Sequence, residues 1–259
     1  MRPGDRLTLF AIGLTIGLTL LDGLTGGGVA AWAQANLAGI ARTAGLWLGR
    51  AGLYLSPLLL VPLLAGLAGR FAALPTPVWS LHRRLIAIID TVTTTVGGAA
   101  RWFALGLVVV TAVIVIQRYV FGYASTKLQE SVIYMHALLF LLASASALLN
   151  GGHVRVDVLF ARAGERGKAW TDLLGTYLAL MPMSLLILWS STGYMSSTWR
   201  ILERSRESDG LPFVFLLKTA IPVFAVLMIL QGLSMAARAA MTIGGQKAPD
   251  VPDAFKGEV

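Results

Sequence analysis

A chain of 259 residues that is 56% hydrophobic and only 13% charged is far more apolar than a soluble domain, in which about 25% of the residues are charged. The net charge of +8 does not indicate nucleic-acid binding, because the basic residues lie in short segments between apolar runs and form no stripe on one soluble face. No cysteine is present, which excludes disulfides, thiolate metal sites and thiol catalysis. With a mean hydropathy of +0.73, the composition predicts an integral membrane protein.

Six apolar runs approach or exceed the length that a membrane-spanning helix needs, which is roughly 20 residues for a hydrocarbon core of about 30 Å. They lie at residues 7–24, 46–68, 102–117, 131–149, 171–198 and 211–236. We therefore expect an all-α, polytopic α-helical integral membrane protein with about six transmembrane helices. The first run has an alternative interpretation as a signal-peptide core, with a cleavage site near Ala33-Gln34-Ala35.

A further helical pattern precedes the third run. Its apolar side chains recur at helical spacing, while polar ones face elsewhere. The apolar set is Val78, Leu81, Leu85, Ile88, Ile89, Val92 and Val96, and the polar set is His82, Arg83, Arg84, Asp90 and Thr94. Two structures fit this pattern: a helix that lies on the cytoplasmic membrane surface, or a cytoplasmic extension of the third span that is interrupted at Gly97-Gly98.

The distribution of lysine and arginine sets the expected orientation, because these residues accumulate on the cytoplasmic side of a membrane. If both termini are cytoplasmic, thirteen basic residues fall in inner segments and seven in outer ones, with Lys218 inside the sixth run. We therefore expect a multi-pass protein of the bacterial inner membrane with both termini in the cytoplasm. Pro182 and Pro222 lie inside the fifth and sixth runs, where each removes a backbone donor and is expected to kink its helix.

Titratable residues are rare in the middle of the apolar runs, which argues against an enzyme or an autonomous pump. His136 is interpreted as a hydrogen-bonded histidine in a contact between helices, with a proton relay or a haem ligand as the alternative. Lys218 is expected to reach the outer interface with its amine, and pairing with a partner subunit is the alternative. We expect no catalytic, metal-binding or cofactor-binding residue in this chain.

Three segments, taken in order, resemble those of a known transporter family. They are Gln117-Arg118-Tyr119-Val120-Phe121-Gly122 with Ser125 and Glu130; then Gly152-His153-Val154-Arg155-Val156-Asp157; and finally Trp199, Glu203, Glu207-Ser208, Gly210-Leu211-Pro212, Lys218 and Pro222. Together they resemble the small membrane subunit of the TRAP (tripartite ATP-independent periplasmic) transporters, over about residues 81–242. The third segment looks most like the branch labelled for mannitol or chloroaromatic compounds. One departure is that Leu128 and Gln129 stand where the family often has tryptophan and a second acid.

The resemblance implies a domain organisation and a set of partners. Residues 1–80 would be an N-terminal extension with two transmembrane helices, residues 81–242 a four-helix core, and residues 243–259 a cytoplasmic tail. The chain would pack beside a large membrane subunit that carries the sodium and substrate sites, while a periplasmic solute-binding protein delivers a substrate that is typically a carboxylate. An ion gradient would drive import. The rival interpretations are a membrane-anchor subunit of a redox complex and an autonomous channel or membrane enzyme.

The segments of the resemblance also supply candidate contact residues. At the outer ends of the spans these are Arg118, Tyr119, Glu130, Glu203, Glu207 and Lys218, and on the cytoplasmic side they are His153, Arg155 and Asp157. The guanidinium of Arg118 is a candidate partner for Glu130, or for the phosphate of a membrane phospholipid. Each cluster either orders its own loop or contacts a partner subunit or lipid, and the sequence leaves both open.

Overall fold

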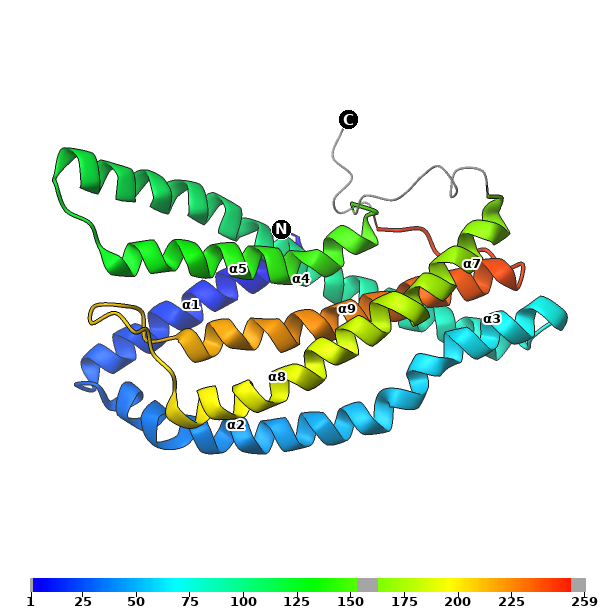
Figure 1. Ribbon diagram of the computed structural model, residues 1–259, viewed down its shortest axis with the longest axis horizontal. Coiled ribbons are helices and arrows are strands. Elements are labelled where there is room, and N and C mark those ends of the chain that lie inside the picture. Colours follow the sequence, from blue (N-terminus) through cyan, green and yellow to red (C-terminus); the bar gives the residue numbers. More distant parts are fainter. Residues whose placement is uncertain (1, 153–162, 253–259) are drawn as a thin grey trace. The chain divides into compact units, whose positions relative to one another are not determined.

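The computed structural model describes residues 2–152 and 163–252, and every regular element within those ranges is helical (Figure 1). Residues 153–162, which include the candidates His153, Arg155 and Asp157, lie outside the described part. The helices, in chain order, are α1 (Pro3–Leu24), α2 (Gly28–Leu55), a 3-10 turn (Ser56–Leu60), α3 (Val61–Phe71), α4 (Thr76–Val120), α5 (Thr126–Leu149), α7 (Glu165–Gly175), a π-helical turn (Thr176–Leu180), α8 (Met181–Ile201) and α9 (Val214–Ile243).

Six helical stretches are long and apolar enough to cross a membrane, which confirms the predicted polytopic, all-α class. The stretches are Pro3–Leu24, Gly28–Phe71, Thr76–Val120, Thr126–Leu149, Glu165–Ile201 and Val214–Ile243. Two of them, Pro3–Leu24 and Gly28–Phe71, precede residue 80, and the division of the chain into an extension and a core stays a prediction. At about 1.5 Å per residue, the 45 residues of α4 extend for about 67 Å, more than twice the thickness of a hydrocarbon core.

The length of α4 decides between the two structures that the sequence allowed for residues 78–96. The helix is continuous from Thr76 to Val120 and has no interruption at Gly97-Gly98, so the segment is an extension of the third span. Its buried face is not the predicted apolar stripe. His82, Asp90 and Thr93 are buried, whereas Leu81 and Ile88 are 39% and 63% exposed. Asp90 and Thr93 face inward because α9 supplies them with hydrogen-bond partners, whereas the Nδ1 atom of His82 lies against a carbonyl oxygen of its own helix.

The chain divides into two compact units, which are described separately. The first unit consists of Met1–Gly49, Thr95–Ala143 and Ser190–Val223, and the second of Arg50–Thr94, Ser144–Trp189 and Phe224–Val259. Because the boundaries fall inside helices, α2, α4, α5, α8 and α9 each contribute residues to both units.

The second unit is packed around the carboxyl-terminal half of α9, which is rich in small side chains. Its alanines 236, 237, 239 and 240 are each no more than 5% exposed. They let larger residues approach closely: Leu173 joins one buried cluster with Ala236, while Trp79, Ile86 and Met241 form another with Ala237. A Cβ atom added to Gly244 would lie 2.5 Å from the ring of Trp79, so the indole uses the space that this glycine leaves. Small residues at contacts between helices are typical of membrane bundles.

The π-helical turn in the fifth span lies directly before Pro182. The wider turn covers Thr176–Leu180, and the α-helical pattern resumes at Met181. Proline has no N–H to donate, and its ring crowds the carbonyl one turn earlier, which favours a widened turn at this point. The predicted disturbance of the fifth span is therefore found as a π-helical turn. Pro222 lies inside α9, whose helix continues on both sides of it.

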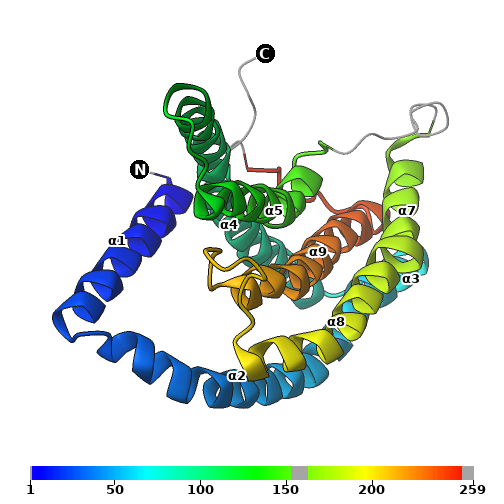
Figure 2. The ribbon, with the colours of Figure 1, turned by 60° about the vertical axis from the view of Figure 1, so that its left-hand side comes forward.

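In the first unit, α1 contacts the rest of the chain through its amino-terminal turn. Asp5 forms an ion pair with Arg101 of α4 and accepts a hydrogen bond of 3.1 Å from the indole N–H of Trp102. A Cβ atom on Gly4 would lie 2.5 Å from the carbonyl carbon of Gly98, so the two backbones meet where neither residue has a side chain. Figure 2 shows this end of α1 beside α4 and the remainder of α1 running away from it.

Replacing Gly4 by alanine is expected to separate the two backbones and to lower the free energy of unfolding by about 1–3 kcal/mol, as overpacking does elsewhere. Gly13→Ala is the matched control, because nothing lies within 4 Å of a Cβ atom at that position. Thermal unfolding in detergent would measure the difference. Equal midpoints for the two variants would contradict the close contact between α1 and α4.

Candidate functional site

The loop between α8 and α9, residues 202–213, is attached to the first turns of α5 by Glu130. One carboxylate oxygen of Glu130 accepts a hydrogen bond from the hydroxyl of Ser205, and the other accepts one of 2.6 Å from the backbone N–H of Leu211. The N–H of Ser205 donates to the carbonyl oxygen of Leu211 at 3.1 Å, which closes the loop on itself. A single charged side chain therefore holds both sides of the loop.

Gly210 explains why the loop can close so tightly. A Cβ atom at this position would lie 2.3 Å from the Oγ atom of Ser205 and 2.8 Å from the Oε1 atom of Glu130. Any other residue would push these groups apart. The glycine of the Gly210-Leu211-Pro212 segment is thus required by the approach of the Glu130 carboxylate.

Glu203 makes a second attachment, between the same loop and α9. Its carboxylate accepts hydrogen bonds from the Lys218 amine at 2.6 Å and from the Thr198 hydroxyl at 2.9 Å. The hydrogen bond from Lys218, followed by that from Thr198, lowers the pKa of Glu203 below its ordinary value. The pair therefore stabilises the loop at neutral pH, and this stabilisation is lost as the pH falls through the lowered pKa of Glu203.

Contacts of the Trp199 side chain join the same two helices, α8 and α9, next to the Glu203 attachment. The indole N–H of Trp199 donates to the Thr219 hydroxyl at 3.0 Å, and the rings of Trp199 and Phe215 meet edge to face with centroids 4.9 Å apart. Such ring pairs contribute about 0.5–1.5 kcal/mol beyond their buried area. The ends of α8 and α9 are therefore joined by ring packing as well as by charge.

The remaining charges of the loop point outward. The side chains of Arg204, Arg206, Glu207 and Asp209 are exposed. Asp209 forms an ion pair of 2.6 Å with Lys127, but both side chains are more than half exposed, and such pairs contribute about 0–1 kcal/mol. The ordered loop thus presents charges of both signs on one short segment.

Several sequence-based expectations require correction here. The predicted pair between Arg118 and Glu130 is wrong, because Glu130 bonds to Ser205 and Leu211, and the ion pairs found among the described residues do not include Arg118. Arg118 and Tyr119 are both exposed at the end of α4. The amine of Lys218, which was expected to reach the outer interface, forms an ion pair of 2.6 Å with Glu203 of the same chain, and its contact with a partner subunit stays a prediction.

A buried polar network that sequence reasoning missed lies in the second unit, between α4 and α9. Arg238 forms an ion pair with the carboxylate of Asp90, whose side chain is 4% exposed. The hydroxyl of Ser234 donates to Asp90 at 2.8 Å and accepts a hydrogen bond of 2.8 Å from Arg238. The Nε atom of Arg238 donates to the carbonyl oxygen of Pro249 at 3.3 Å, so the same guanidinium also holds the segment after α9.

A signal for this pair was present in the sequence. Asp90 is the only acidic residue within the 45 residues of α4, and Arg238 is one of two basic residues in α9. A single acidic residue and an isolated arginine in apolar helices are expected to form an ion pair, since burying an unpaired charge costs much free energy. The sequence pattern indicated only that Asp90 faces away from the apolar side chains of its helix, and this hid the requirement.

Further buried polar atoms accompany the network. The Thr93 hydroxyl donates to the Gln231 side-chain oxygen at 3.0 Å, and the Nδ1 atom of His82 lies 2.8 Å from the carbonyl oxygen of Val78. Residues 2–152 and 163–252 contain no group of three histidine, cysteine or acidic side chains placed to hold a metal ion. The hydrogen bond between Thr93 and Gln231 joins α4 to α9, as the ion pair of Asp90 with Arg238 does.

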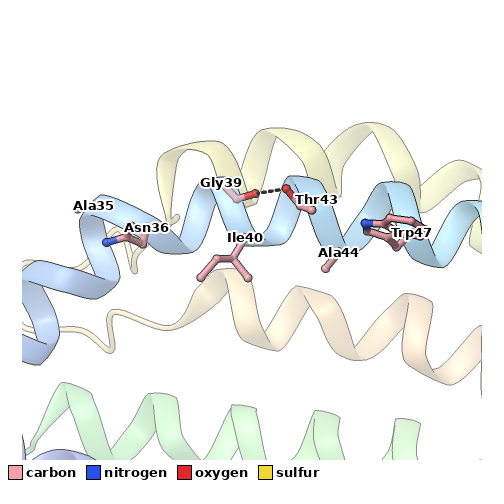
Figure 3. Close-up of a pocket in the computed structure, with 7 residues that line it drawn as sticks. All are labelled: Ala35, Asn36, Gly39, Ile40, Thr43, Ala44 and Trp47. Atoms are coloured by element: carbon pink, nitrogen blue, oxygen red, sulfur yellow. Dashed lines mark hydrogen bonds between the residues drawn. The ribbon is translucent and has the colours of Figure 1, made fainter.

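A shallow hollow along α2 is formed by one helix alone (Figure 3). The residues lining it are Ala35, Asn36, Gly39, Ile40, Thr43, Ala44 and Trp47. Its two polar side chains bond to their own helix, Thr43 to the carbonyl oxygen of Gly39 at 3.1 Å and Asn36 to that of Trp32 at 2.9 Å. The lining carries no charged group.

Long apolar helices, loops fixed by intrachain hydrogen bonds and buried polar contacts between helices define a multi-pass α-helical membrane protein. The chain belongs to the family of tripartite ATP-independent periplasmic transporters, DctQ component, whose family model matches residues 107–242, more than half of the chain. This is a family of transporter components and not of enzymes. No curated protein and no solved structure matches the chain. The match includes Glu130, Glu203 and Arg238 but begins after Asp90. The assignment to a mannitol or chloroaromatic branch stays a prediction.

Asp90→Ala is expected to lower the free energy of unfolding by about 3–5 kcal/mol, because it leaves the buried guanidinium of Arg238 without its counter-charge. The double variant Asp90→Ala with Arg238→Met is expected to be more stable than the single variant, since it removes the uncompensated charge. Unfolding midpoints in detergent measure both, with exposed Thr91→Ala as the control. A single variant as stable as this control would contradict the role of the pair.

Glu130→Ala is expected to release the loop between α8 and α9. The variant loses two hydrogen bonds to a charged group, each worth about 1.5–3 kcal/mol, so the loop opens more often. We therefore expect trypsin to cleave after Arg204 and Arg206 at least about ten times faster. Gln129→Ala, at the exposed neighbouring position, is the control and should leave the cleavage rate unchanged. If the two variants were cleaved equally fast, Glu130 would not hold the loop.

Proposed function

We propose that this chain is the small membrane subunit of an ion-gradient-driven secondary transporter, and that it assembles with a large transport subunit and a periplasmic solute-binding protein. The family match over residues 107–242 is the observation that carries the proposal, because it identifies a component of a tripartite transporter. The large subunit would carry the sodium and substrate sites. The solute imported by the complex would be of the carboxylate type.

The orientation that we propose follows from the excess of lysine and arginine in the inner segments. With both termini in the cytoplasm, the loop between α8 and α9 faces the periplasm. A soluble binding protein would then meet Arg204, Arg206, Glu207 and Asp209. Charges of both signs on a preorganised loop favour a specific, rapidly formed encounter with a complementary surface. The attachments by Glu130 and Glu203 support this role, because they fix the loop before a partner arrives.

The charged residues of the spans support a structural role for this subunit. The Lys218 amine is bound by Glu203, and Arg101 is bound by Asp5, so both cations are used in contacts within the chain. A subunit that only positions and supports a transport subunit needs no ion path of its own. We infer that coupling to the ion gradient takes place in the large subunit.

Uptake of radiolabelled solute into proteoliposomes tests the proposal. Vesicles that contain the chain, the large subunit and the binding protein should take up solute when a sodium gradient is applied, and vesicles that contain this chain alone should not. Transport by the chain alone would contradict the proposed role and favour an autonomous channel. An absorbance spectrum of bound haem would instead favour a redox anchor.

Charge reversal in the loop separates docking from assembly. The double variant Arg204→Glu with Arg206→Glu is expected to reduce uptake about tenfold at low ionic strength by slowing encounter with the binding protein. The amount of membrane complex should not change. Lys247→Glu, an exposed position in the other unit, is the control. Unchanged uptake in the loop variant would contradict the docking role.

A further inference from the structure

One face of α5 carries exposed residues along the amino-terminal half and the middle of the helix. Gln129, Ile133, His136 and Phe140 follow each other at spacings of four, three and four residues, which places them on one side of the helix. All four are exposed, with Ile133 and Phe140 at 61% and 66%. Two of the four are polar. This α5 face is therefore not the uniformly apolar surface that lipid tails would favour.

His136 lies close to the midpoint of its span. The helix covers Thr126–Leu149, 24 residues or about 36 Å, so it exceeds a hydrocarbon core of about 30 Å only slightly. His136 is ten residues from the first residue of α5, or about 15 Å along its axis.

The exposed position of His136 also contradicts its interpretation as a histidine in a contact between helices of this chain. Its side chain is exposed, and the hydrogen bonds found among the described residues do not include it. Lysine and arginine can extend to the interface from such depths, but an imidazole on a single methylene cannot. A polar ring that faces hydrocarbon without a hydrogen-bond partner is strongly disfavoured. The α5 face is therefore expected to be covered by protein.

We propose that the α5 face is the surface on which a transmembrane helix of the large subunit packs, and that this helix presents a hydrogen-bonding side chain to His136. The inference rests on the proposed function, which supplies the partner, and adds the surface that the partner occupies. Ile133 and Phe140 lie one turn to either side of the histidine and provide apolar contact area. The complementary chemistry is a carboxylate, amide or hydroxyl at the same depth, flanked by small or apolar residues that allow close approach.

Photo-crosslinking in the native membrane tests the contact directly. A benzophenone amino acid is placed at Ile133 or at Phe140 of the tagged chain, and the adducts are identified by mass spectrometry. The matched control is Ile16, which is 54% exposed and lies near the middle of α1. We expect adducts to a transmembrane segment of the large subunit from the two positions on α5 and none from the control. Adducts only to lipid or to a second copy of this chain would overturn the inference.

Substitution of His136 tests the hydrogen bond separately from the contact. His136→Leu keeps an apolar surface but removes the polar group, whereas His136→Gln retains one. Because hydrogen bonds between membrane helices contribute modestly, His136→Leu should weaken copurification of the large subunit roughly 3-fold to 20-fold relative to His136→Gln. Equal recovery with both variants would overturn the role of His136.

The proposed function can fail independently of this surface. If no large subunit copurifies with the unmodified chain from its native membrane, the proposed function is wrong. The proposed contact of the α5 face with that subunit is then wrong as well. If the large subunit copurifies but crosslinks only from α1, the proposed function stands and the assignment of the α5 face is wrong.

Discussion

The buried ion pair between Asp90 and Arg238 is the interaction on which the second unit depends. A carboxylate at this position can be buried only because a guanidinium and a hydroxyl from α9 reach it, and the guanidinium in turn binds the carbonyl oxygen of Pro249. This requirement fixes which face of α4 is turned inward. It explains why Leu81 and Ile88 are exposed while His82 and Thr93 are buried. The small residues of α9 allow Trp79 and Ile86 to pack closely against Ala237.

The first unit uses carboxylates in the same way, but at a surface. Glu130 and Glu203 each accept hydrogen bonds from two donors, and together they fix the loop between α8 and α9. The charges used for this purpose lie at the base of the loop, whereas the arginines remain free to face outward. An ordered loop loses less conformational entropy when it binds a partner. Glu130 and Glu203 thus hold the loop, while Arg204 and Arg206 stay exposed. This arrangement suits a subunit that binds partner proteins through its surface.

The sequence predicted the class of fold and the family well, and contacts between distant residues poorly. Runs of apolar residues determine the spans locally, so their number and their approximate positions could be read directly. Pro182 likewise acts on its own turn, and the disturbance of the fifth span was predictable. The partner of Glu130 was not, because Ser205 is 75 residues away and the nearer Arg118 offered a more obvious charge. For Asp90 the sequence pattern indicated only a polar face opposite the apolar side chains, and it could not show that this polar face is the buried one. In a membrane, lipid is an equally good environment for apolar side chains, and polar groups decide which face is buried.

A component of a tripartite transporter should leave its own membrane bound to a second membrane subunit. Native mass spectrometry of the chain, extracted in a mild detergent, tests this association without reference to any substrate. We expect a species that dissociates in the gas phase into this 27.6 kDa chain and a larger polytopic membrane protein. Detection of only the 27.6 kDa chain, of its homo-oligomers, or of an assembly containing haem would contradict it.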